Sequence, residues 1–235
     1  ACTGNISYLC NKPFEDGKIH LVYDTMTLDA SAGDLLHNTW EKPRVIASYF
    51  RIPKSENKRI CLIDTPGVNA ATHVEHGEMT YQALLNETYD TCVCVISENN
   101  YQTFDELKHM QWLYGHISEH KIIFAFNKMD NYHAEDNIDQ NVDKLRRILK
   151  KVGFIDPVIC PISAKCALLH KIITYEEMLS NEERREYEDL LWKFNEPQYD
   201  LSRFYDLAVF SPDKSALITK CGFTGFEKIV FGGKK

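Results

Sequence analysis

Four short apolar runs, separated by longer segments of helical period, constrain the fold of this chain most strongly. Each run is apolar throughout rather than at every second residue, which is typical of strands that helices cover on both faces. The runs are RICLIDT (59–65), TCVCVIS (91–97), KIIFAFN (121–127) and PVICPIS (157–163). The segments between them are 73–87, 103–118 and 134–152, each long enough for a helix of about three to five turns. We therefore expect an α/β fold, doubly wound, with a mostly parallel sheet and helices on both faces.

Local signals indicate where several helices begin and end. Thr103 with Glu106, and Ser180 with Glu183, have the spacing of a capping box, so helices are predicted to start directly after Thr103 and Ser180. Gly153 suits the end of the helix before it, because glycine adopts the backbone conformation that closes a helix.

The two ends of the chain differ from this alternating middle. Residues 1–57 have a more antiparallel style, with strands expected at 6–10, 18–23 and 45–50 and a short helix at 34–40. After the last apolar run we expect a helical insertion at 174–210 and a closing helix around Phe223–Phe231, and we predict that residues 1–235 form one domain that includes this insertion.

Composition excludes several classes of function. The formal net charge of −7 argues against a general attraction to nucleic acid, so no nucleic-acid partner is expected. No apolar run approaches the roughly 18–20 residues that cross a bilayer, and ACTGNISYLC lacks the features of a secretory signal. The eight cysteines include no CxxC pair, and we interpret them as reduced thiols of a cytoplasmic protein.

The first motif that carries chemistry is Asp64-Thr65-Pro66-Gly67, directly after the first apolar run. The carboxyl end of a strand is where α/β folds bind ligands. There Asp64 can hold Mg²⁺ through a water molecule, and the Gly67 amide can donate to a terminal phosphate. Thr65 lies in the same loop and is a further candidate for contact with the ligand. The alternative is a plain turn after a strand, because proline and glycine are common in loops.

The second motif, Asn127-Lys128-Met129-Asp130, follows the third apolar run. A carboxylate at Asp130 can accept two hydrogen bonds from the N1–H and the exocyclic amine of guanine, a donor pair that adenine lacks. Asn127 would brace the neighbouring loops, and the stem of Lys128 would cover one face of the base. A helix-capping loop is the alternative interpretation.

The third motif, Ser163-Ala164-Lys165, ends the fourth run. Here the backbone N–H of Ala164 would donate to the guanine oxygen, and Lys165 would flank the base. The tripeptide alone carries little information. All three motifs occur in order at the ends of separate predicted strands, and chance agreement is on the order of one in ten thousand.

This series resembles the guanine-nucleotide motifs of the GTPase superfamily over residues 1–172, and within it the chain is most similar to bacterial dynamin-like GTPases. ACTGNISYL looks like their switch segment, which would place Thr3 at the threonine that coordinates Mg²⁺ and senses the γ-phosphate. The resemblance implies GTP/GDP and Mg²⁺ as cofactors, with Thr3, Asp64 and Gly67 in catalysis. It also implies a homodimer through the nucleotide face and a peripheral membrane contact made by regions outside this chain.

One departure from that family is the phosphate loop, because the chain contains no G-x-x-x-x-G-K-[ST]. Gly17-Lys18 has a lysine, Lys12, where the first glycine is required. We expect the missing central strand, loop and helix to precede Ala1. Without that strand its neighbours would expose unpaired backbone groups, so we expect the isolated chain to fold poorly or to recruit a partner strand.

A second departure concerns catalysis. Val68 follows Gly67, where Ras-like enzymes place the glutamine that orients the attacking water. The resemblance to dynamin-like proteins implies hydrolysis that depends on self-association.

Two alternatives stay open. A ribosome-assembly, Era-like GTPase would carry an RNA-binding module, and the acidic charge and the long insertion argue against it. A GTPase fold that binds partners without hydrolysing nucleotide is the other alternative.

Overall fold

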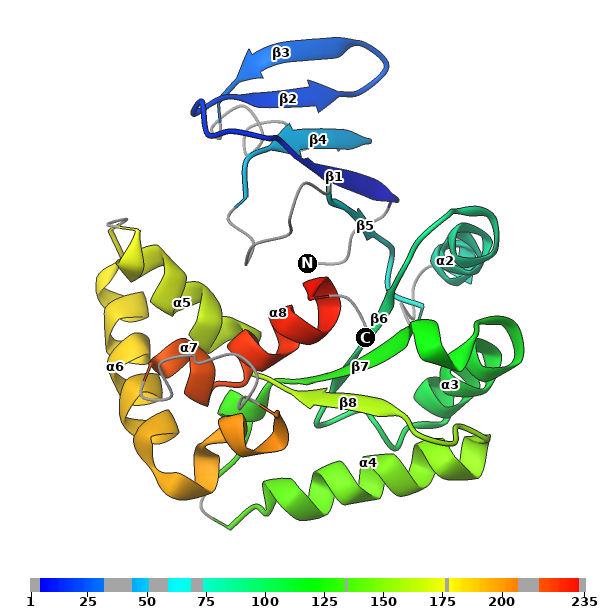
Figure 1. Ribbon diagram of the computed structural model, residues 1–235, viewed down its shortest axis with the longest axis vertical. Coiled ribbons are helices and arrows are strands. Elements are labelled where there is room, and N and C mark those ends of the chain that lie inside the picture. Colours follow the sequence, from blue (N-terminus) through cyan, green and yellow to red (C-terminus); the bar gives the residue numbers. More distant parts are fainter. Residues whose placement is uncertain are drawn as a thin grey trace. The chain divides into compact units, whose positions relative to one another are not determined.

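The computed structural model of the chain is drawn in Figure 1, and the structure describes residues 5–31, 44–50, 59–68, 74–133, 135–175, 178–206 and 216–232. Its contacts divide the chain into two compact units, residues 1–88 (unit 1) and 89–235 (unit 2). The α/β class is confirmed, because helices and strands occur together in both units. The division into one domain with an insertion stays a prediction.

Unit 1 contains a five-stranded mixed sheet in the order β3-β2-β4-β1-β5. Strand β1 pairs in parallel with β4 and antiparallel with β5, and β2 pairs antiparallel with β3 and β4. The three strands predicted near the start of the chain are confirmed as β1, β2 and β4. The bounds of the strands are β1 (Ser7–Asn11), β2 (Ile19–Val22), β3 (Met26–Ala30), β4 (Val45–Ser48) and β5 (Cys61–Asp64).

Strand β3 and the helix predicted at 34–40 are the two parts of unit 1 in which the structure does not match a prediction or does not test it. Strand β3 was not predicted, because four of its five residues are exposed and it has no apolar face that a local pattern would reveal. The short helix predicted at 34–40 lies outside the described residues. Helix α2 (Val74–Asn86) follows β5 and corresponds to the helix predicted at 73–87.

Unit 2 is built on a three-stranded parallel sheet in the order β6-β7-β8. Its strands are β6 (Cys92–Ser97), β7 (Ile122–Asn127) and β8 (Val158–Pro161). The first five residues of β7 are all buried, on both faces of the sheet, which is the property that the uninterrupted apolar run predicted.

Helices cover both faces of this parallel sheet (Figure 1). On one face, Ile123 and Cys160 pack against helix α8 (Phe223–Phe231). On the other face, the ring of Phe124 meets Phe154 edge to face at 5.2 Å between centroids, directly after helix α4 (Ile138–Val152). Helix α3 (Phe104–His116) packs beside α4 on that side, and its Tyr114 ring also contacts Phe154. The layering predicted for the sheet is therefore present within unit 2.

The predicted helix ends agree with the structure. The Thr103 side chain accepts a hydrogen bond from the backbone of Glu106 at the start of α3. Ser180 and Glu183 form a reciprocal capping box at the start of helix α6 (Asn181–Asn195). Gly153 ends α4 with φ of 132°, and a Cβ added there would lie 2.4 Å from the Tyr114 ring.

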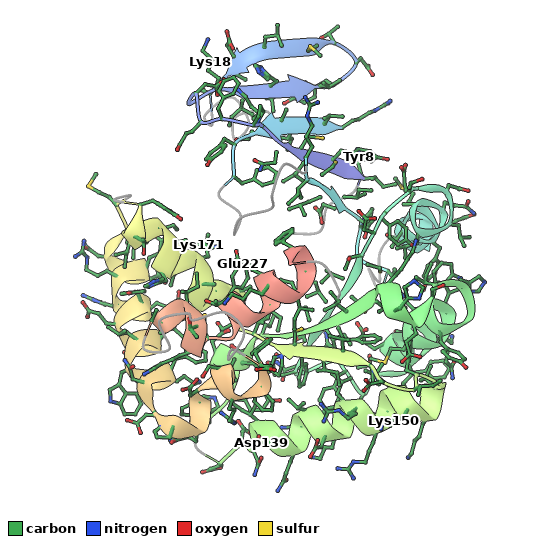
Figure 2. All side chains as sticks on the ribbon, viewed as in Figure 1. Tyr8, Lys18, Asp139, Lys150, Lys171 and Glu227 are labelled. Atoms are coloured by element: carbon green, nitrogen blue, oxygen red, sulfur yellow. The ribbon has the colours of Figure 1, made fainter. Side chains whose placement is uncertain are left out.

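Helices occur where the insertion and the closing helix were predicted. Residues 174–210 contain α6 and two short 3-10 segments, η3 (Pro197–Tyr199) and η4 (Leu201–Phe204), while residues 176–177 and 207–210 lie outside the described part. A short helix, α7 (Leu217–Lys220), precedes α8, whose bounds match the predicted closing helix. Lys171 of helix α5 (Ala164–Thr174) forms an ion pair with Glu227 of α8 at 2.5 Å (Figure 2).

The prediction of one mostly parallel sheet is wrong for the described strands, which form two sheets. All four apolar runs are strands, but the first of them, β5, pairs antiparallel with β1 in the mixed sheet of unit 1. An apolar run indicates a strand without indicating its partner, because pairing depends on residues far away in the sequence. In the part of the chain that the structure describes, no helix is both long and apolar enough to cross a membrane.

Candidate nucleotide site

The Asn127–Asp130 loop begins where β7 ends. Asn127 is the last residue of the strand, and Lys128 adopts a left-handed backbone conformation with φ of 68°. That conformation is uncommon for a residue with a side chain and turns the chain sharply. Met129 is fully buried and anchors the turn, whereas Asp130 is half-buried and Lys128 is exposed. The polar groups of the motif therefore lie at the surface while its apolar residue fixes the loop to the core.

The Ser163–Lys165 loop is bound directly to the Asn127–Asp130 loop. The Ser163 hydroxyl donates to Oδ1 of Asp130 at 2.6 Å, and the Ala164 amide donates to Oδ1 of Asn127 at 3.0 Å. Ser163 is fully buried and also accepts a hydrogen bond from the Cys166 amide, as the N-cap of α5. Two motifs that lie 33 residues or more apart in the sequence are thus joined by two hydrogen bonds.

One oxygen of the Asp130 carboxylate is still available to accept hydrogen bonds from a ligand. Its Oδ1 accepts from Ser163, and its Oδ2 accepts no hydrogen bond from any described residue. An ionised carboxylate offers about four lone-pair positions on two oxygens. Asp130 can therefore accept a pair of adjacent N–H donors without giving up the Ser163 bond.

Helix α6 contacts both loops. Lys193 donates from Nζ to the backbone carbonyl oxygens of Asp130, at 2.5 Å, and Tyr132. The ammonium also lies 4.8 Å from the centre of the Tyr199 ring. Desolvation lowers the pKa of Lys193, partly offset by the nearby carboxylates of Asp130 and Asp136. Lys193 thus fixes the main chain of the Asn127–Asp130 loop from the insertion.

Two further contacts involve the polar residues of these loops. Lys165, predicted to flank the base, is exposed and forms an ion pair with Glu186 of α6. Asn131 donates from its amide to Oε1 of Glu98, which follows β6, at 2.8 Å. The turn after β7 is therefore held by Glu98, which follows β6, by Ser163 at the N-cap of α5 and by Lys193 of α6.

In unit 1, the Asp64–Gly67 loop begins at the last residue of β5. Asp64 and Gly67 are exposed, and Thr65 is half-buried. Pro66 is buried, and its carbonyl oxygen accepts a hydrogen bond of 2.6 Å from Thr80 of α2. A Cβ added at Gly67 would meet nothing within 4 Å, so no described atom crowds that side of the residue. The loop is fixed at its centre and exposed at the two residues predicted to act on phosphate and metal.

The chemistry of Asp64 fits Mg²⁺ only in part. Magnesium is usually held by one or two carboxylates together with phosphate oxygens and water. The exposed carboxylate of Asp64 can supply one such ligand, directly or through water. Among the described residues, no group of three or more histidine, cysteine or acidic side chains could hold a metal ion. Thr3, the other predicted ligand, lies outside the described residues.

The structure brings together five of the predicted site residues, which are Asn127, Asp130, Ser163, Ala164 and, through the same helix start, Lys165. Asp64, Thr65 and Gly67 belong to unit 1. Sequence reasoning missed Lys193, Glu186 and Glu98. These residues carry no local signal, because each contacts a loop that lies more than 20 residues away in the sequence.

Comparison with known proteins gives little further information. No protein-family model matches the chain, and no curated protein does. A solved structure of the cytosolic domain of L. pneumophila FeoB has 13% sequence identity, over 74% of this chain and 80% of that chain, with a TM-score of 0.26. A TM-score this low does not demonstrate a shared fold, so the functional argument depends on the site itself.

Proposed function

We propose that unit 2 binds the base of a guanine nucleotide through Asp130, with Asn127, Ser163 and Ala164 holding the binding loop. The observation that carries the proposal is the pair of hydrogen bonds from Ser163 to Asp130 and from Ala164 to Asn127. These bonds fix a half-buried carboxylate with a free acceptor edge at the carboxyl ends of two parallel strands. Guanine presents two adjacent N–H donors that suit such an edge, and adenine does not.

The proposal extends to hydrolysis of GTP to GDP and phosphate, with Mg²⁺. Asp64 and Gly67 would act on the metal and the terminal phosphate, with Thr65 in the same loop and Thr3 as a further metal ligand. The exposure of Asp64 and of Gly67 supports these roles, because both residues can be reached by a ligand. Lys128 and Lys165, both exposed, would flank the base.

The finer assignment is a doubly wound GTPase domain of dynamin-like type. It would couple the nucleotide state to homodimerisation or membrane remodelling and would act in the cytoplasm, peripherally at a membrane. The support for it is the order of the three motifs and the likeness of the first residues to a switch segment. Specific GTPase activity measured over about two decades of protein concentration tests this assignment, because catalysis that needs a dimer rises with concentration.

The base-binding proposal is tested by titrating the protein with a fluorescent GDP analogue. Replacing Asp130 by Asn removes a charged acceptor and should weaken GDP binding by roughly 10- to 100-fold, since a hydrogen bond to a charged group contributes about 1.5–3 kcal/mol. The asparagine amide adds a donor, which suits the second carbonyl oxygen of xanthine. We therefore expect the variant to gain affinity for xanthosine diphosphate relative to GDP.

The matched control is Asp189→Asn, the same chemical change at an exposed position of α6. It should leave both affinities unchanged. Binding of GDP that is equally strong in the wild type and in Asp130→Asn would contradict the proposal. Binding without turnover would favour the interaction module over the enzyme.

A further inference from the structure

Two cysteines lie opposite each other in the sheet of unit 1. Cys10 of β1 and Cys61 of β5 are direct partners in the antiparallel ladder. The next pair along, Asn11 and Ile60, carries a backbone hydrogen bond of 2.8 Å from the Asn11 amide. Because bonded and non-bonded pairs alternate in such a ladder, Cys10 and Cys61 occupy a non-bonded position, where Cα atoms approach to about 4.5 Å.

The two thiols are already close. Their sulfur atoms are 3.3 Å apart, and a disulfide bond of about 2.05 Å needs them to approach by about 1.2 Å. Cα atoms at a non-bonded position also lie within the range of about 4.4–6.8 Å that disulfides span. Rotation of the side chains, without a change in strand pairing, is sufficient to form the bond.

This pair is also open to reagents. Cys61 is exposed and Cys10 is half-buried. A second close pair, Cys166 and Cys221 in unit 2, shares a hydrogen bond between side chains, but both of its residues are fully buried. Oxidation by thiol exchange requires an external disulfide to reach one sulfur, so the two pairs should differ in reactivity.

We propose that Cys10 and Cys61 form a redox-active dithiol that a low-molecular-weight disulfide converts into a cross-strand disulfide. In the first step, the thiolate of one cysteine attacks a sulfur of the external disulfide, whose S–S bond breaks and releases one thiol. In the second step, the other cysteine attacks the mixed disulfide, forms the Cys10–Cys61 bond and expels the second thiol. Two protein thiols are oxidised, the external disulfide is reduced to two thiols, and the two protons pass to them.

The link would have a defined position in unit 1. It would join β1 to β5 three residues before Asp64, where the Asp64–Gly67 loop begins. A covalent bond between Cys10 and Cys61 fixes the register of the two strands, and therefore the end of β5 from which the loop starts. The inference does not depend on nucleotide binding, because it rests on the geometry of two strands alone.

The experiment treats the folded protein with glutathione disulfide at about pH 8, blocks the remaining thiols and maps the peptides by mass spectrometry. The raised pKa of Cys61, about 11, makes a mildly alkaline pH useful because exchange needs the thiolate. We expect a Cys10–Cys61 cross-linked peptide that has lost two hydrogen atoms, while Cys166 and Cys221 remain reduced. In urea the ratio of cross-link to mixed disulfide should fall roughly tenfold or more, because the effective concentration of the neighbouring thiol is lost.

The variant Cys10→Ser isolates the second step. Its Cys61 should carry one glutathione and form no cross-link, whereas Cys166→Ser should react at Cys10 and Cys61 as the wild type does. Stable glutathione adducts on both Cys10 and Cys61 in the folded wild-type protein would overturn the proposal, as would an absence of reaction at both. If Cys10→Ser does not fold, the wild-type peptide map decides alone.

Discussion

Replacing Ser163 by Ala tests whether the two base-binding loops depend on each other. The Ser163 hydroxyl makes two hydrogen bonds, accepting from the Cys166 amide as the N-cap of α5 and donating to Asp130. Ser180 is the matched control, because it caps the start of α6 in the same way but does not contact Asp130. The same substitution there removes a cap alone.

The expected losses differ in size. Losing a serine N-cap costs about 1 kcal/mol in free energy of unfolding. Losing a hydrogen bond to a carboxylate adds about 1.5–3 kcal/mol, reduced to the lower part of that range because water can reach a half-buried Asp130. We expect Ser163→Ala to lose about 2.5–3 kcal/mol and Ser180→Ala about 1 kcal/mol.

Urea unfolding followed by circular dichroism measures both losses, and titration with a fluorescent GDP analogue measures the effect on the site. Only Ser163→Ala should weaken nucleotide binding, because only this variant releases the Asp130 side chain. Equal losses of stability in the two variants, with unchanged m values, would show that the Ser163–Asp130 bond contributes nothing and that the loops are not coupled by it.

Three further predictions concern Lys193, His109 and Gly222. Lys193→Met should lower the free energy of unfolding by about 1–3 kcal/mol, because two carbonyl oxygens lose their donor; an unchanged urea midpoint would refute this. Burial lowers the pKa of His109 to about 4 from 6.5, so the unfolded chain takes up the proton first as pH falls. Stability should therefore drop by about 2 kcal/mol from about pH 7 to about pH 5 in urea titrations, and the drop should be absent in His109→Leu. Gly222→Ala should destabilise far more than Gly17→Ala in thermal unfolding: both have positive φ, but only at Gly222 does the new Cβ meet a backbone oxygen, at 2.2 Å.

The sequence predicted those parts of the fold that local chemistry determines. Capping by Ser180, the close of α4 at Gly153 and the burial of β7 all follow from residues a few positions apart. The partner of β5 and the existence of β3 could not be predicted, because strand pairing depends on distant residues and β3 has little apolar surface.

The same distinction holds for the site. The positions of Asn127 and Asp130 at the end of a strand follow from the apolar run before them. The donor to the backbone of their loop, Lys193, lies more than 60 residues away and has no motif. A charged helix such as α6 resembles a solvated surface helix in sequence, and its contacts with the loops emerge only when Leu190 and Phe194 are buried.

The polar contacts that Glu186 and Lys193 of α6 make should respond differently to a bound base. The ion pair between Lys165 and Glu186 is between exposed side chains, and such pairs contribute at most about 1 kcal/mol. A base that recruits Lys165 can therefore break this pair at little cost. The bonds of Lys193 go to backbone carbonyl oxygens rather than to the Asp130 carboxylate, so a base bound by that carboxylate need not break them. We therefore expect a bound base to change the contact between Lys165 and Glu186 and to leave the contact between Lys193 and the loop in place.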